Sequence, residues 1–94
     1  MILQDPEQHE LSALLARLPQ PAARVVEIGC GDGRLTRRYA AHVESVLAID
    51  PDERSTAAFR SNGIDPNVDL RTTSVDRLQL PDASVDVVLF SWAL

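Results

Sequence analysis

VVEIGCGDG, residues 25–33, decides the fold of this chain. The run from Arg24 to Ile28 is short and rich in β-branched residues, and a glycine closes it, which is typical of a buried parallel strand. Residues 34–41 after the glycines have a helical pattern. A glycine-rich turn between a strand and a helix lets backbone approach a ligand without Cβ hindrance and aims free N–H groups at it. The stretch therefore predicts a ligand-binding strand–loop–helix unit.

The rest of the chain continues the alternation of strands and helices. Residues 45–49 predict a second strand, which ends in Asp50-Pro51, and residues 52–62 predict a helix that Gly63 stops. Residues 68–72 and 85–90 predict a third and a fourth strand. Alternating strands and helices imply a parallel sheet with right-handed crossovers. We expect an α/β fold, a doubly wound Rossmann-like sheet in the order 3-2-1-4, with the ligand at the carboxyl ends of strands 1 and 2.

The first 20 residues predict a cover helix for this sheet. Asp5-Pro6 has the form of an N-cap followed by proline at the first helical position. Apolar residues then recur at the spacing of one helical face, and Pro19 and Pro21 end the element. The leucines of that face are Leu11, Leu14, Leu15 and Leu18.

The spacing of the glycines discriminates between classes of ligand. A dinucleotide-binding turn, G-x-G-x-x-G, would require glycine at position 34, where this chain has Arg34. Glu27, two residues before the first glycine, would repel a pyrophosphate and favours a ligand that carries positive charge. Both residues disfavour a nicotinamide-dependent oxidoreductase.

This stretch resembles motif I of the class I, Rossmann-like S-adenosylmethionine-dependent methyltransferases, in particular domains of the methyltransferase type 11 kind. The resemblance extends to Asp50, 17 residues after Gly33, and to LQLPDASVDVV, residues 78–88, which is similar to the family's connection into its fourth strand. It covers nearly the whole chain and is most specific at residues 25–33 and 78–88.

The resemblance implies S-adenosylmethionine as cofactor and a set of contact residues. Asp50 would accept hydrogen bonds from both ribose hydroxyls. The adenine contact falls on Ser74 and on the backbone N–H of Val75, with Asp76 as the competing acceptor, while Asp86 is interpreted as a strand-end cap without a cofactor contact. The cofactor-binding residues that the resemblance implies are Glu27, Gly29, Cys30, Gly31, Gly33, Asp50, Pro51, Ser74 and Val75.

Composition and charge exclude several other classes. The formal net charge is -5 and all nine basic residues are scattered arginines, so we expect no nucleic-acid partner. Cys30, the one cysteine, lies between two glycines where a small side chain is needed, and it indicates a reducing cytoplasm rather than a disulfide or a catalytic thiol. His9 and His42 lack metal-ligand spacing, and no metal is predicted. The longest apolar run, Val87 to Phe90, is too short to span a membrane.

With 94 residues, we expect one domain, with residues 24–94 as the cofactor-binding core, that stops before the substrate-binding half of the family. Residues 85–94 would then form an unpaired edge strand that exposes Val88, Phe90 or Trp92 and favours self-association. By resemblance the reaction is methyl transfer to an unidentified acceptor, expected to be a small molecule, and the catalytic residues are not identified. The alternative is a non-catalytic cofactor-binding remnant or a partner subunit of a split methyltransferase.

Overall fold

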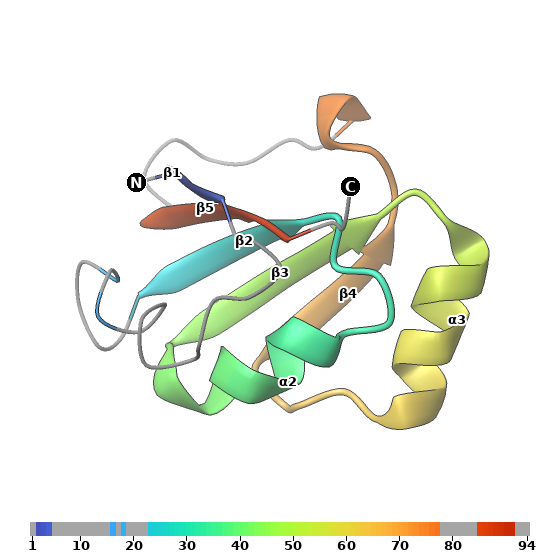
Figure 1. Ribbon diagram of the computed structural model, residues 1–94, viewed down its shortest axis with the longest axis horizontal. Helices are drawn as coiled ribbons and strands as arrows, with labels where there is room; N and C mark the ends of the chain where they lie inside the picture. Colours follow the sequence, from blue (N-terminus) through green and yellow to red (C-terminus); the bar gives the residue numbers. More distant parts are fainter. Residues whose placement is uncertain (1, 5–15, 17, 19–22, 78–84, 92–94) are drawn as a thin grey trace.

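The computed structural model describes residues 2–4, 16, 18, 23–77 and 85–91, and Figure 1 shows their arrangement as one parallel sheet flanked by helices. The predicted N-terminal helix lies almost entirely outside the described residues. Leu18 is described, and it packs against the core. The elements are β1 (Ile2–Gln4), β2 (Arg24–Ile28), α2 (Arg34–Tyr39), η1 (Ala40–His42), β3 (Ser45–Asp50), α3 (Glu53–Asn62), β4 (Val68–Thr72), η2 (Val75–Arg77) and β5 (Val87–Phe90).

The sheet has the order β1-β5-β2-β3-β4, and every neighbouring pair is parallel. The sub-order β4-β3-β2-β5 is the predicted 3-2-1-4 arrangement, so the fold prediction is confirmed. The chain leaves β2 toward β3 and β4 on one side, and β5 returns to its other side. Ile28 at the end of β2 is in register with Ile49 and with Phe90, so the three carboxyl ends meet at one edge of the sheet.

Strand β1 corrects one expectation. Ile2, Leu3 and Gln4 pair in parallel with Val88, Leu89 and Phe90, so β5 is an inner strand and the predicted unpaired edge is wrong for Val87–Phe90. The N-terminus, interpreted from sequence as the lead-in to a helix, supplies the missing partner. Val88 and Phe90 are half-buried rather than exposed, and Trp92 lies outside the described residues.

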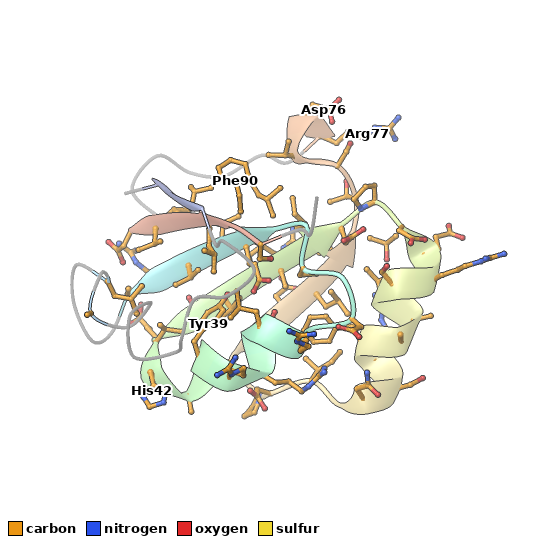
Figure 2. All side chains as sticks on the ribbon, in the orientation of Figure 1. Tyr39, His42, Asp76, Arg77 and Phe90 are labelled. Carbon is orange, nitrogen blue, oxygen red and sulfur yellow. The ribbon has the colours of Figure 1, made fainter. Side chains whose placement is uncertain are left out.

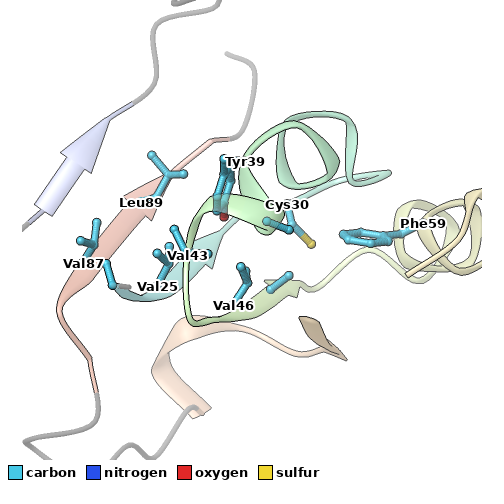
Figure 3. Close-up of a cluster of buried hydrophobic side chains, with 11 residues drawn as sticks. Val25, Cys30, Tyr39, Val43, Val46, Phe59, Val87 and Leu89 are labelled. Carbon is cyan, nitrogen blue, oxygen red and sulfur yellow. The ribbon is translucent and has the colours of Figure 1, made fainter. Parts of the chain in front are cut away.

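The core lies between the sheet and helices α2 and α3. Figure 3 shows Val87 and Leu89 of β5, Val25 of β2 and Val46 of β3 in one cluster with Tyr39 of α2. Tyr39 and Phe59 of α3 are each 1% exposed, and burying a side chain of that size stabilises the fold by about 1.5–3 kcal/mol. Both helices therefore pack on the same face of the sheet, as right-handed crossovers from β2 to β3 and from β3 to β4 require.

The helix ends follow their local signals. The Asp52 side chain accepts a hydrogen bond from the N–H of Arg54 and caps α3, and Gly63 with φ 102° closes it. The predicted helix over 34–41 is divided into the short α2 and one 3-10 turn, η1. In the described part of the chain, no helix is both long and apolar enough to cross a membrane.

Candidate functional site

The glycine loop joins β2 to α2 at the carboxyl edge of the sheet, and its glycines have different structural roles. Gly31 has φ +57°, and a Cβ placed there would have no other atom within 4 Å, so its surroundings are open space. Gly33 has φ +84°, and a Cβ there would lie 2.7 Å from the ring of Phe59. Gly31 therefore leaves room for a ligand, whereas Gly33 is required for packing against α3.

The loop N–H groups have partners within the chain. Those of Gly29 and Cys30 both donate to the carbonyl of Ile49, at 2.9 and 3.0 Å, and that of Gly33 donates to the carbonyl of Cys30. The N–H of Gly31 donates to Asp50 Oδ2 at 2.9 Å. The expectation that the loop presents free N–H groups to a ligand is wrong for these four residues, because three of these groups bond to β3 and that of Gly33 bonds within the loop. These loop residues contribute open space next to Gly31 to a ligand site, rather than hydrogen-bond donors.

Asp50 ends β3 beside this space and is half-buried. Its Oδ2 accepts from Gly31 and its Oδ1 accepts from the N–H of Asp52 at 2.8 Å. A carboxylate has about four lone-pair sites, so each oxygen retains an acceptor site beyond these two bonds. Two backbone donors hold the carboxylate in place, and this half-buried group keeps acceptor capacity for a ligand.

The end of β4 brings the predicted adenine contacts next to Asp50. Asp50 is in register with Thr72, and the N–H of Thr73 donates to the Asp50 carbonyl at 3.1 Å. Ser74 follows directly and is half-buried, while Val75, the first residue of η2, is 50% exposed. An exposed apolar side chain beside a polar site is a suitable contact for a flat aromatic ligand.

Asp76, the competing acceptor, is exposed on η2. In Figure 2, Asp76 and Arg77 project from this turn away from the sheet. Asp76 therefore projects away from the sheet (Figure 2), whereas Ser74 comes directly after Thr73, whose N–H donates to the Asp50 carbonyl.

Glu27 lies beneath the loop and is 0% exposed. Its Oε1 accepts hydrogen bonds from the hydroxyls of Thr36 and Tyr39, both at 2.6 Å, and its Oε2 accepts one from the hydroxyl of Ser91. Burial and the neighbouring carboxylate raise the pKa of Tyr39 well above its usual range, so its hydroxyl stays a donor. Figure 2 shows Tyr39 directed from α2 toward the sheet. Glu27 can therefore act on a ligand through its charge and through the loop, not by contact at the surface.

Comparison with known proteins decides the family, because residues 25–94 match the family described as a methyltransferase domain. The chain belongs to this family. The prediction that the glycine stretch and the 78–88 connection mark a class I methyltransferase domain is thereby confirmed.

Individual relatives agree with this assignment. A Mycobacterium tuberculosis protein named "probable S-adenosylmethionine-dependent methyltransferase" is 42% identical over 72 residues, which are 76% of this chain and 26% of that protein. The chain thus spans about a quarter of the length of this relative.

Two solved structures share the fold. The S-adenosylmethionine-dependent methyltransferase of Mesorhizobium loti has a TM-score of 0.69 at 33% identity, over 87% of this chain and 38% of that one. A Haemonchus contortus phosphoethanolamine N-methyltransferase, solved with phosphoethanolamine and S-adenosylhomocysteine, has a TM-score of 0.73 at 30% identity, over 87% of this chain and 18% of that one.

Within the methyltransferase domain, the remaining predicted residues have clear places. Pro51 follows Asp50 and is exposed, at the start of the turn into α3. Cys30 is 6% exposed, and burial together with the nearby Glu27 carboxylate raises its pKa to about 12, so the thiol is protonated at neutral pH and is unsuited to nucleophilic catalysis. Asp86 accepts hydrogen bonds from the backbone N–H and the Nε of Arg24, at 2.9 and 3.1 Å. Its interpretation as a strand-end cap is confirmed.

Sequence reasoning missed the hydroxyl groups that surround Glu27. Thr36 and Tyr39 lie nine and twelve residues after Glu27 on the helix, and Ser91 follows β5. An apolar residue would have looked equally acceptable on the buried face of the helix or after the strand end, so no sequence signal marks these positions. Among the described residues, no group of three or more His, Cys, Asp or Glu side chains could hold a metal ion.

Proposed function

We propose that this chain forms the cofactor-binding part of an S-adenosylmethionine-dependent methyltransferase. The observation that carries the proposal is the open space above Gly31 next to the Asp50 carboxylate, which Gly31 itself holds by a hydrogen bond of 2.9 Å. The M. tuberculosis and M. loti proteins, both named for dependence on S-adenosylmethionine, support the same cofactor.

Asp50 would bind the ribose of the cofactor. Two adjacent hydroxyls match the two oxygens of one carboxylate, and each oxygen of Asp50 retains acceptor capacity after its backbone bonds. Gly29, Cys30, Gly31 and Gly33 shape the loop on which the methionine part of the cofactor would lie, and Pro51 borders the ribose. The buried charge of Glu27 beneath that loop favours a ligand with an ammonium and a sulfonium group.

Ser74 and Val75 would contact the adenine. The Ser74 hydroxyl can accept from the exocyclic amino group, and the backbone N–H of Val75 can donate to a ring nitrogen. The exposed Val75 side chain also offers an apolar surface to the ring. Because a neutral hydroxyl is a weaker acceptor than a carboxylate, we expect modest selectivity for adenine.

The reaction would be transfer of the sulfonium methyl group to a nucleophile on an acceptor. The residues of this chain bind and orient the cofactor, and the chemistry of methyl transfer belongs to the cofactor itself. We propose a small-molecule acceptor, since the related H. contortus enzyme was solved with phosphoethanolamine. The dispersed arginines and net charge of -5 support a protein without a nucleic-acid partner, and the single free cysteine supports a cytoplasmic location.

Calorimetric titration with S-adenosylhomocysteine tests this proposal. Replacing Asp50 by Ala leaves the ribose hydroxyls without their charged acceptor and should weaken binding by about 1.5–3 kcal/mol. The matched control is Asp69→Ala, which removes the same charge from an exposed position on β4 where Asp69 pairs with Arg71. If Asp50→Ala binds like the parent, the ribose assignment is wrong.

A methyl-transfer assay with labelled cofactor and candidate small-molecule acceptors separates the enzyme from its alternative, a cofactor-binding remnant or partner subunit. Binding with turnover supports the enzyme. Binding without turnover for any acceptor would favour the partner subunit.

A further inference from the structure

Ser91, the residue that follows β5, is bonded to three consecutive residues at the junction between β2 and the glycine loop. Its N–H donates to the carbonyl of Ile28 at 3.0 Å, and its hydroxyl donates to Glu27 Oε2. The same hydroxyl oxygen lies 3.2 Å from the carbonyl oxygen of Gly29. The end of β5 is thus fixed to the point where the chain turns out of β2 into the loop.

The Glu27 carboxylate links this point to α2 as well. Its Oε1 accepts from Thr36 and Tyr39 of α2, and its Oε2 accepts from Ser91. Because Glu27 is 0% exposed, water cannot replace a lost donor without a change in the surrounding structure. The two sides of the carboxylate therefore hold different parts of the molecule, α2 at Oε1 and the end of β5 at Oε2.

The Oε2 side of the carboxylate lies nearer to the start of the glycine loop than the Oε1 side does, as judged by the residues that each side contacts. The Gly29 carbonyl lies beside the Ser91 hydroxyl, and Gly29 is followed within two residues by Gly31, which faces the open space. A shift of the β5 end would move the start of the loop directly. Loss of the Thr36 hydroxyl would act on α2, which begins only after Gly33.

We propose that Ser91 is a positioning residue for the cofactor site: by donating to Glu27, its hydroxyl holds the end of β2, from which the glycine loop starts at Gly29, against the end of β5 and so sets the position of the Gly31 backbone. The identity of the ligand rests on the proposed function, whereas the positioning of the loop does not. Ser91 acts through Glu27 and the loop rather than by touching the reacting atoms.

The test compares three variants of the 94-residue chain with the parent. Ser91→Ala removes the hydroxyl on the β5 side, and Ser91→Thr keeps it. Thr36→Val is the matched control, because it removes a hydroxyl donor from the same carboxylate on the α2 side with almost no change of shape.

The first measurement needs no ligand. Amide hydrogen exchange at Cys30 and Gly31, corrected for each variant's global stability, should be about tenfold faster in Ser91→Ala than in the parent, equivalent to about 1.4 kcal/mol of local opening. Thr36→Val and Ser91→Thr should stay within about twofold of the parent. Equal exchange in Ser91→Ala and Thr36→Val would overturn the proposal.

The second measurement is the affinity for S-adenosylhomocysteine by calorimetry. We expect about tenfold weaker binding for Ser91→Ala, parent-like binding for Ser91→Thr, and no more than about twofold loss for Thr36→Val. If the parent itself does not bind, the proposed function fails, while the exchange data still decide the role of Ser91. If Ser91→Ala does not fold, Ser91→Cys replaces it, because cysteine keeps a weak S–H donor. Amide exchange in Ser91→Cys should then be faster than in the parent by less than about tenfold. An exchange rate equal to that of the parent would contradict the inference.

Discussion

Gly33→Ala should damage the fold, while Gly31→Ala should damage the ligand site. At Gly33 the backbone has φ +84°, and an added Cβ would lie 2.7 Å from Cε2 and Cζ of Phe59. Phe59 is 1% exposed, and the guanidinium carbon of Arg37 lies 5.9 Å from the centroid of its ring. The ring therefore has little freedom to move away from the added Cβ. At Gly31 the backbone has φ +57°, and the Cβ would meet nothing within 4 Å.

The magnitudes follow from these two environments. A left-handed backbone costs an alanine about 1–2 kcal/mol, which both variants share. Overpacking of a buried ring adds about 1–3 kcal/mol for Gly33→Ala alone. We therefore expect the free energy of unfolding to fall by about 2–5 kcal/mol for Gly33→Ala and by about 1–2 kcal/mol for Gly31→Ala.

Urea denaturation followed by circular dichroism measures both values, and Phe59→Leu provides the control. A smaller side chain at position 59 relieves the clash, so the double variant Gly33→Ala/Phe59→Leu should be more stable than the sum of the single losses predicts. Calorimetry with S-adenosylhomocysteine should give the reverse ranking, with the larger loss of affinity in Gly31→Ala. A loss of stability in Gly31→Ala equal to that in Gly33→Ala would refute the division of roles between the two glycines.

Three further predictions concern single side chains. Ser74→Asp should tighten S-adenosylhomocysteine binding in calorimetry because a charged acceptor replaces a neutral one, while Asp76→Ala should leave it unchanged; the reverse result would assign the adenine contact to Asp76. The pKa of Cys30 is raised to about 12 from 9.0, so the thiol of the unfolded chain loses its proton at lower pH than the thiol of the folded chain. The free energy of unfolding should therefore fall between pH 9 and pH 12, and this fall should be smaller in Cys30→Ala. Asp86→Ala should lower the urea midpoint by the equivalent of about 1 kcal/mol. One backbone donor loses its acceptor, and the ion pair with Arg24, which is only partly buried, adds little because solvent screens it.

The fold was predictable because strand and turn signals are local. The β-branched run before Gly29, the Asp52 cap with the Gly63 stop, and the end of the second strand at Asp50 each depend on a few neighbouring residues, and the structure has them where the sequence places them. Strand β1 was not predictable in this way. Ile2 to Gln4 is too short for periodicity, and its pairing with β5 joins residues more than 80 positions apart.

The site was predictable in its residues but not in the use of its polar atoms. Asp50 lies beside Gly31 as the motif implies, yet the N–H groups of Gly29, Cys30 and Gly31 are engaged by Ile49 and Asp50. A pattern of glycines reports where backbone can be approached, and it cannot report which N–H groups the turn needs for itself. The hydroxyls on Glu27 were missed for a related reason, since serine, threonine and tyrosine are common at such positions and reveal their role only when the fold brings them to one carboxylate.

The engaged N–H groups change how a ligand would be recognised here. With four loop donors bonded inside the chain, Gly31 offers space rather than hydrogen bonds, and the charge next to that space comes from Asp50 at its side and Glu27 below. Two carboxylates and a loop in which four backbone donors are already bonded form a poor site for a phosphate group, which needs N–H donors and positive charge. The same arrangement suits a ligand whose hydroxyls donate and whose other groups are cationic, because each can meet a carboxylate without displacing a bond of the turn. We therefore propose that the backbone hydrogen bonds of the loop, together with the acidic side chains, favour a sulfonium cofactor over a dinucleotide.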